Sequence, residues 1–574
     1  TKLHALLYFF IYIIILFVSS LAMRTRNGNL HLEIQTSRKS PVGILRTSFR
    51  DKQTGSIRHT QHGRITGCTL EQLKMLQLAF REKVLPADSP AAFRILQSKE
   101  YGASRVLLEL TKSLGLHRIL YSRTEPWVQS ALAMIVGRIL YQGSKLALCN
   151  QSANTTLWEQ CGIQGRPEVN EHCYEPLDCL LQRQTVIQRQ LATKHLSNGC
   201  LVLYDITSTY FEGEYSESRI VRFGYNRDKK KGHKQVVMGL LCSREGCPVG
   251  CEIFPGNTND ATTVTGKIEE LREQYGLEKI IFVGDRGMVT SSQLEKLQGV
   301  EGLNTISALT HAEITNLLKN EVIQMELFDE REIVEVVDPD KPTERYCLCR
   351  NPVSQQKEDR TRNALLDKTA EGLNKIAAYK QRVTTEVLAS RIGKLFSKTK
   401  MEKFVRWEIQ CDPLNERSNQ HKVIWSWNEE KLASERLLDG CYIIRTDVAS
   451  ERLGKEEVVN CYKTLGEVER AFRSLKTVHL EMRPVYHKKD DRIRAHLFMC
   501  VLAYYVQWHL VERLRPIFAS DGDGENRRWT VQNALERLKQ ITSNTVESQG
   551  IQFEQISELT PEQQTILNHL NLSL

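Results

Sequence analysis

Three side chains suited to phosphate chemistry recur every seven residues in the segment CYKTLGEVERAFRSLK. They are Tyr462, Glu469 and Lys476. On an α-helix, seven residues turn by about 700°, roughly 20° short of two full turns, so a phenol, a carboxylate and an ammonium group would share one face. A carboxylate on a helix is most often a solvated surface group, so this spacing alone leaves the role of Glu469 open.

Two aspartates end short apolar runs far upstream of this segment. Asp205 ends the run LVLYD, and Asp285 ends the run IIFVGD. Such runs indicate buried strands, and an acid at the end of a strand projects into the crevice where α/β proteins bind ligands. Asp205, Asp285 and Glu469 could therefore converge. Converging carboxylates repel one another unless a cation lies between them, and hard oxygen ligands favour Mg²⁺ or Mn²⁺.

The chain resembles, in several segments, bacterial insertion-sequence transposases of the DDE class. The segments are, in order, YDITSTYFEGE, KGHKQVVMGLL, PGNTNDATT, FVGDRGM, DGCYIIRTD, YKTLGEVERAFRSLK and RPVYH. The likeness is greatest to the group with a Tyr-Arg-Glu-Lys signature and a β-rich insertion before the catalytic glutamate. It runs from about Met23 to the C-terminal region, and its motifs are specific in combination but weak singly.

The resemblance implies a role for ten residues. Asp205, Asp285 and Glu469 would be catalytic and would hold two Mg²⁺ (or Mn²⁺) ions, and the DNA-binding residues would be Tyr462, Arg473, Lys476, Arg286, Lys234, His487 and Trp425. The sequence departs from the family pattern at one position, because the arginine expected three residues after the tyrosine is Leu465. Arg473, one turn beyond Glu469, could make the missing phosphate contact.

Several of these residues also have ordinary structural explanations. The basic run from Arg227 to Lys234 is either a solvated loop or a grip on the scissile phosphate. His487 is either a DNA contact or a surface histidine. Related transposases hold a flipped base on an aromatic side chain of the insertion. The candidates here are Trp407, Trp425 and Trp427, but core packing is favoured for each one singly.

Three cysteines lie close together in a predicted hairpin: Cys242, Cys247 and Cys251. We expect them to pack between strands, with a metal site as the alternative.

The surrounding pattern predicts an α/β fold with a ribonuclease-H-like catalytic core. Its strands are expected at residues 201–207, 235–241, 249–254, 279–284 and 304–308, with helices at 261–275 and 291–298. The interval between Asp285 and Glu469 is much longer than that between Asp205 and Asp285, and too long for a simple return to the sheet. A β-rich insertion is therefore expected between Asp285 and Glu469, with five strands and one long helix over 355–392.

The expected domain order follows from these assignments. It is an apolar segment outside the fold (1–22), a basic β-hairpin arm (23–66), a helical DNA-binding domain (67–198), the core's first part (199–309), the β-rich insertion (310–460), the core's second part with the catalytic Glu helix (461–515) and a C-terminal helical tail (516–574). The arm could follow DNA phosphates or be a simple exposed module. For residues 1–22, translated upstream sequence is favoured over a membrane anchor or a signal peptide.

Composition is compatible with a nucleic-acid enzyme. The 574 residues carry a net charge of +9 with 26% charged residues, a basic excess also common in other soluble proteins. Fifteen cysteines without paired CxxC spacing argue for a reducing compartment.

The function predicted from the resemblance is metal-dependent cut-and-paste DNA transposition. End cleavage through a DNA hairpin would precede strand transfer by the 3′-hydroxyl. The expected partners are double-stranded DNA, both the terminal inverted repeats and the target, and a second copy of the chain in a homodimer. No membrane association is expected. The expected location is the bacterial cytoplasm, at the nucleoid. The alternatives are a metal-dependent nuclease without strand transfer and a catalytically inactive DNA-binding regulator.

Overall fold

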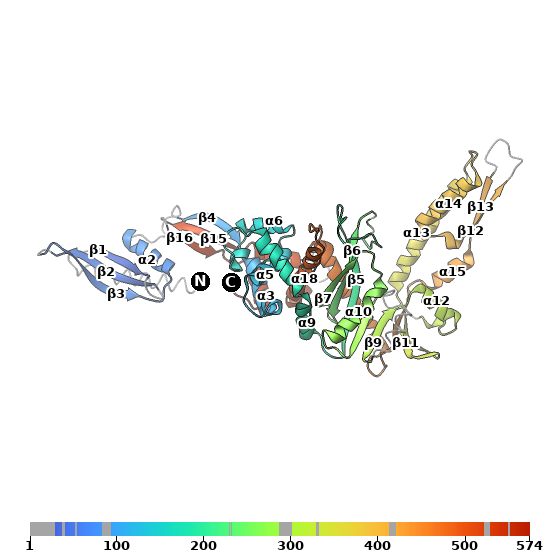
Figure 1. Cartoon of the computed structure of the whole chain (residues 1–574), viewed down its shortest axis with the longest axis horizontal. Helices are drawn as coiled ribbons and strands as arrows, with labels where there is room; N and C mark the ends of the chain where they lie inside the picture. The colour runs from blue at the N-terminus through green and yellow to red at the C-terminus, as the bar shows by residue number, and fades with distance from the viewer. Residues whose placement is uncertain are drawn as a thin grey trace. The chain divides into compact units, whose positions relative to one another are not determined.

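The structure, a computed structural model, divides into two compact units (Figure 1). The first combines Thr1–Glu109, Asn150–Arg166 and Pro516–Leu574, and the second combines Leu110–Cys149 and Pro167–Arg515. The residues it describes are 29–36, 41–51, 54–82, 93–228, 230, 232–285, 301–328, 332–411, 421–521, 528–548 and 551–574. The apolar segment 1–22 lies outside them.

The first unit begins with a small antiparallel sheet in the order β1-β2-β3, covered by one helix. Its elements are β1 (Asn29–Gln35), β2 (Val42–Arg50), β3 (Ile57–Ile65) and α2 (Leu70–Glu82). Leu32 and Ile44 of the sheet and Leu73 of α2 are buried, whereas most of β3 is exposed. The predicted hairpin arm is thus a three-stranded sheet with its own small core.

A second antiparallel sheet joins segments that we predicted to be helical. Its order is β16-β15-β4, and its strands are β4 (Phe93–Glu100), β15 (Thr542–Ser548) and β16 (Ile551–Ile556). The C-terminal tail also contains α19 (Val531–Lys539) and α20 (Pro561–Leu570), so it is mixed rather than helical. The prediction was wrong here because β4 pairs with β15, a strand near the opposite end of the chain and beyond any local pattern.

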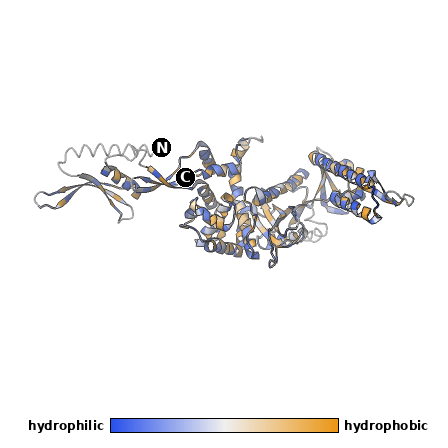
Figure 2. Ribbon diagram, turned by 90° about the horizontal axis from the view of Figure 1, so that it is seen from above, coloured by the Kyte–Doolittle hydropathy of each residue, from blue (hydrophilic) through white to orange (hydrophobic). Residues whose placement is uncertain are grey.

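The helices between residues 100 and 198 are mostly short. They are α3 (Gly102–Ser113), α4 (Leu116–Leu120), α5 (Pro126–Leu140), α6 (Lys145–Asn150), α7 (Leu157–Gln160), α8 (Glu175–Gln182) and α9 (Gln184–His195). α5 is largely buried and starts with a proline, which suits the first turn because its missing N–H needs no partner there. Hydrophobic residues (orange) and hydrophilic residues (blue) share most of the helices in Figure 2, as helices that cover a core require.

Within the described ranges no single helix is long and apolar enough to cross a membrane. Two helices bent by 96°, Pro126–Leu140 and Lys145–Ala153, pass the same test of length and composition only when taken together.

The second unit is built on a mixed eight-stranded sheet in the order β10-β11-β14-β9-β8-β5-β6-β7. The five strands predicted for the core are present: β5 (Cys200–Tyr210), β6 (Gln235–Ser243), β7 (Pro248–Pro255), β8 (Ile280–Gly284) and β9 (Leu303–Ala308). β8 is parallel to both β5 and β9, and the other pairs are antiparallel. The mixed α/β class is confirmed.

Helices from three parts of the chain contact this sheet. α9 lies against β7, and α10 (Asp260–Glu273) is tied to β7 by an ion pair of 3.2 Å between Lys267 and Glu252. α16 (Lys455–Lys463) contacts β8 and β9, and α17 (Leu465–Arg473) contacts β5. The long apolar helix expected after Lys476 is α18 (Asp490–Ser520), and the helix expected at 291–298 lies outside the described residues.

The segment predicted as a β-rich insertion differs from that prediction. Three of its strands, β10 (Val334–Asp338), β11 (Lys341–Arg350) and β14 (Cys441–Thr446), extend the main sheet beyond β9. The other two, β12 (Val405–Cys411) and β13 (His421–Trp427), form a separate hairpin. Helices make up more of the segment than strands do: α12 (His311–Lys319), α13 (Pro352–Ala377), α14 (Thr385–Thr399) and α15 (Glu429–Leu437).

The helix predicted over 355–392 is in fact the pair α13 and α14. Leu373 of α13 and Leu388 and Ile392 of α14 are fully buried in one core cluster. A single straight helix would place these residues far apart along its axis, so the burial of apolar side chains favours folding the helix back on itself.

Candidate active site

The two aspartates lie at the same level of two neighbouring parallel strands. Tyr204 of β5 pairs with Gly284, the last residue of β8, so Asp205 and Asp285 come next along the chain. Asp285 follows the end of β8, as predicted, but Asp205 lies within β5, which continues to Tyr210 beside β6. The expectation that Asp205 ends its strand was therefore wrong, because pairing with β6 extends β5 beyond the apolar run; Asp205 instead lies beside the end of β8.

Asp205 titrates unusually for an aspartate. The pKa of its carboxyl is raised to about 7, mainly by burial and also by the negative charges of Asp285 and Glu469, although the backbone N–H of Ile206 and the charge of Arg227 oppose the shift. The Ile206 N–H donates to Asp205 Oδ1 at 2.7 Å. Glu469, which is distant from Asp205 in the sequence, is therefore close enough in space to act on it.

The helix with the heptad is less regular than predicted. Tyr462 lies in the last turn of α16, Glu469 lies in α17, and Lys476 lies in a π-helical turn, Ser474–Val478. A π turn holds more residues than an α turn and changes the direction of the side chains that follow. The three residues therefore do not share one continuous α-helical face.

Two of the heptad side chains nevertheless contact Asp285 or the strand of Asp205, and the charge of the third, Glu469, acts on Asp205. The Tyr462 hydroxyl donates to Asp285 Oδ1 at 3.0 Å. Lys476 Nζ donates to Thr207 Oγ1 at 2.6 Å. Because side chains two residues apart in a strand share a face, Thr207 marks the face of β5 to which Asp205 belongs. The structure thus brings Asp205, Asp285 and the heptad together on one side of the sheet.

Asp228 and Arg483 are part of this site, and our sequence reasoning missed them. Asp228 accepts from Lys476 Nζ at 3.1 Å and from Arg483 Nη1 at 2.8 Å, and all three side chains are mostly buried. The Arg483 guanidinium also lies 4.5 Å from the centre of the Tyr210 ring. One carboxylate between two cations leaves an excess positive charge, which suits a site for a phosphate. The signal in the sequence was an acid within the basic run 227–234.

Glu467, two residues before Glu469 in α17, is partly buried. It forms an ion pair with Arg470, and its Cβ lies against the turn between β6 and β7. A Cβ added to Gly246 of that turn would lie 2.7 Å from Glu467 Cβ, and Gly246 has a φ of +86°. Only glycine suits this position, because both the backbone conformation and the close approach exclude a side chain.

Other candidates are not joined to this group by a described contact. Lys234 Nζ lies 5.8 Å from the centre of the Phe223 ring. Arg473 is exposed, and Leu465, in place of the family arginine, is buried in the core. Arg286 lies outside the described residues.

His487 and Trp425 are packed against neighbouring side chains. The His487 ring lies 5.7 Å from that of Tyr174, and burial lowers its pKa to about 4. Trp425 packs edge-on to Trp427 at 5.3 Å, and its indole N–H donates to Asn374 at 3.2 Å. Trp407 on the facing strand is 37% exposed. DNA contact by His487 or Trp425 stays a prediction.

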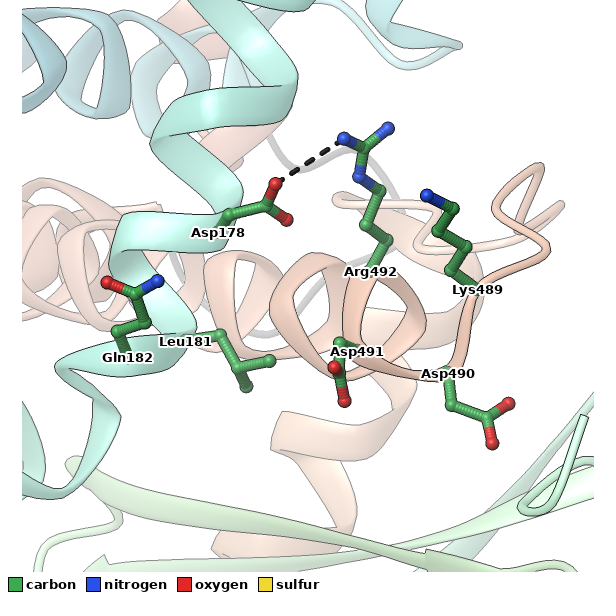
Figure 3. A pocket seen from close by; sticks show the side chains of 7 residues that line it. All are labelled: Asp178, Leu181, Gln182, Lys489, Asp490, Asp491 and Arg492. Carbon is green, nitrogen blue, oxygen red and sulfur yellow. Dashed lines mark hydrogen bonds and ion pairs between the residues drawn. The ribbon is translucent and has the colours of Figure 1, made fainter.

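A separate pocket lies between α8 and the start of α18 (Figure 3). Arg492 forms an ion pair with Asp178 at 3.4 Å, and its guanidinium stacks on Tyr174. The pocket is lined by Asp178, Leu181, Gln182, Lys489, Asp490, Asp491 and Arg492. It includes none of the three carboxylates of the candidate active site.

An acidic group at the edge of a mixed sheet, with cations beside it, suits divalent metal ions and a phosphate substrate. The family model of the transposase DDE domain matches residues 199–506, from the start of β5 into α18. The match covers more than half of the 574 residues, and the chain belongs to this family. No curated protein matches the chain significantly.

Proposed function

We propose that the chain is a cut-and-paste transposase in which Asp205, Asp285 and Glu469 are the catalytic residues. The observation that carries the proposal is the action of Asp285 and Glu469 on the Asp205 carboxyl, within a chain of the DDE transposase family. The strand order β7-β6-β5-β8-β9, with β5, β8 and β9 parallel, supports a ribonuclease-H-like core.

The three carboxylates suit two Mg²⁺ or Mn²⁺ ions. A buried carboxyl with two like-charged neighbours gains most from bound cations, and oxygen ligands match these hard ions. The triad is not among the described groups whose ligand atoms all lie within 4.8 Å of one another. Two ions are proposed because one on each side of the scissile phosphate serves both the attacking and the leaving oxygen. When bound, the ions would activate water and stabilise the leaving oxygen.

The protein groups around the carboxylates have distinct roles in this proposal. Tyr462 orients Asp285 through its hydroxyl. Lys476 and Arg483, which both pair with Asp228, face the phosphate and stabilise its charge during attack. Hydrolysis breaks the P–O3′ bond at the transposon end and leaves a 3′-hydroxyl. In strand transfer that hydroxyl attacks a phosphodiester of the target, and the broken target strand is the leaving group.

The remaining parts would handle DNA and assembly. The arm at 23–66 and the region 67–198 would bind the terminal inverted repeats, and Lys234, Arg286, Arg473 and His487 would contact DNA. An aromatic residue of the insertion, Trp425 in our prediction, would hold a flipped base while a DNA hairpin forms. Two copies of the chain would pair the two ends, in the bacterial cytoplasm at the nucleoid.

A cleavage and joining assay tests this function. The substrate is DNA that carries the inverted repeats flanking the coding gene, with a supercoiled plasmid as target. We expect Mg²⁺-dependent nicks at the repeat ends and joined products, and neither with Asp205→Asn, which should still bind the DNA. Nicking without joined products would indicate a nuclease, and binding without any cleavage would indicate an inactive regulator; either result would overturn the proposal.

A further inference from the structure

Three potential metal ligands meet at a second place in the catalytic unit, away from the carboxylate triad. They are His195 at the end of α9, Cys247 in the turn between β6 and β7, and His509 in α18. One ligand atom of each lies within 4.8 Å of the others. Cys247 Sγ and His509 Nε2 are 4.0 Å apart. Among the described residues, this is the one such group of histidine, cysteine or acidic side chains.

These distances are close to those of a tetrahedral zinc site. With Zn–S of about 2.3 Å and Zn–N of about 2.0 Å, a sulfur and a nitrogen bound to the same ion lie roughly 3.5 Å apart. The Cys247–His509 distance therefore needs to close by only about half an ångström. Imidazole and thiolate are the ligands that zinc prefers over Mg²⁺, so the site would not compete with the carboxylates for the same ion.

The rings of both histidines pack against the ring of Tyr505, with centroids 5.5 Å away for His195 and 4.6 Å away for His509. The Tyr505 hydroxyl lies 3.0 Å from His195 Nε2, a polar partner of the kind that orients metal-binding imidazoles.

A metal ion bound at the sulfur would make the Cys247 thiol lose its proton, because the ion's charge then lies directly at the sulfur.

We propose that His195, Cys247 and His509 bind a zinc ion that fastens the β6–β7 turn to α9 and α18. On binding, the Cys247 thiol would release its proton to solvent and the thiolate would coordinate the metal. The three side chains leave the fourth position of a tetrahedral zinc to water. This proposal does not depend on transposition.

The turn between β6 and β7 connects the proposed zinc site to the candidate active site. Gly246, next to Cys247, packs against Glu467 of α17, two residues from Glu469. A zinc ion that holds the turn would therefore also support the helix that carries the third carboxylate. The site would be structural, since none of its ligands belongs to the catalytic group.

Metal analysis of the untagged, full-length protein tests the proposal. Asp205→Asn protein serves as the host, so that the carboxylate site is weakened. We expect about one zinc per chain by mass spectrometry. We also expect a thiolate-to-metal charge-transfer band when Co²⁺ replaces the zinc, because carboxylate sites give no such band. If the protein contains no stoichiometric zinc and Co²⁺ titration produces no such band, the proposed site is refuted.

Variants locate the metal. Cys247→Ser and His509→Asn should lose the zinc and the charge-transfer band, whereas Cys251→Ser, a buried cysteine of the same hairpin, should keep both. Added Zn²⁺ should raise the melting temperature of the host protein but not that of Cys247→Ser. Circular dichroism shows whether a variant is folded. If a variant does not fold, the cobalt spectrum of the Asp205→Asn protein decides whether the zinc site exists. Retention of the band by Cys247→Ser would assign the metal elsewhere and refute the proposal.

Discussion

Replacement of Glu469 by Gln should remove activity without weakening the fold. Glu469 is exposed, and in the described part of the chain it forms no ion pair, while its charge repels Asp205. Removing that charge relieves the repulsion, so the change in the free energy of unfolding should be zero or slightly stabilising, within about 0.5 kcal/mol. Cleavage should fall by at least about 100-fold, because even residues that only support a metal ligand change affinity or activity by about 10–100-fold.

The matched control is Glu467→Gln in the same helix. Its ion pair with Arg470 is solvent-exposed, with side chains 33% and 67% accessible, so its loss costs roughly 0.3–0.5 kcal/mol. Glutamine keeps the Cβ contact with Gly246. Even if the whole of that energy appeared in the barrier, cleavage would change only about 2-fold.

Three measurements on both variants separate the possibilities. Cleavage rates with Mg²⁺ report the chemistry, DNA binding without Mg²⁺ reports recognition, and urea unfolding reports stability. We expect a low rate with intact binding and stability for Glu469→Gln only. Equal, mild effects of the two substitutions, or a larger effect of Glu467→Gln, would refute the assignment of Glu469 and with it the three-carboxylate mechanism.

Two further predictions follow from the contacts of the aspartates. In the presence of EDTA, the folded protein holds the Asp205 proton up to about pH 7, whereas an ordinary aspartate has a pKa of 3.8, so the contribution of Asp205 to stability should fall as pH rises from about 4 to 7. In urea unfolding, Asp205→Asn should lack this part of the pH dependence. Identical pH profiles of the two proteins would contradict the raised pKa. Tyr462→Phe removes the hydrogen bond to Asp285, so the Mg²⁺ concentration needed for half-maximal cleavage should rise about 10–100-fold, while DNA binding is unchanged. An unchanged Mg²⁺ requirement would show that Tyr462 does not orient Asp285.

Local patterns were sufficient where each element depends on neighbours in sequence. The apolar runs before Asp205 and Asp285 predicted β5 and β8, and the polarity of the segment around Glu469 predicted a helix. Those signals are reliable because strand and helix periodicities are expressed within a few residues. The same patterns predicted a regular heptad face, which the turn at Thr464 and the π turn after Arg473 interrupt.

The sequence by itself determined the family and the core strands and predicted the three carboxylates of the proposed chemistry, because each is encoded in a short motif. Only the tertiary structure decided which strands pair across long intervals, that Asp228 joins Lys476 to Arg483, and that Cys247 meets two histidines rather than its neighbouring cysteines. Such contacts depend on the burial of apolar surface by the whole unit, which brings together side chains that no local spacing relates.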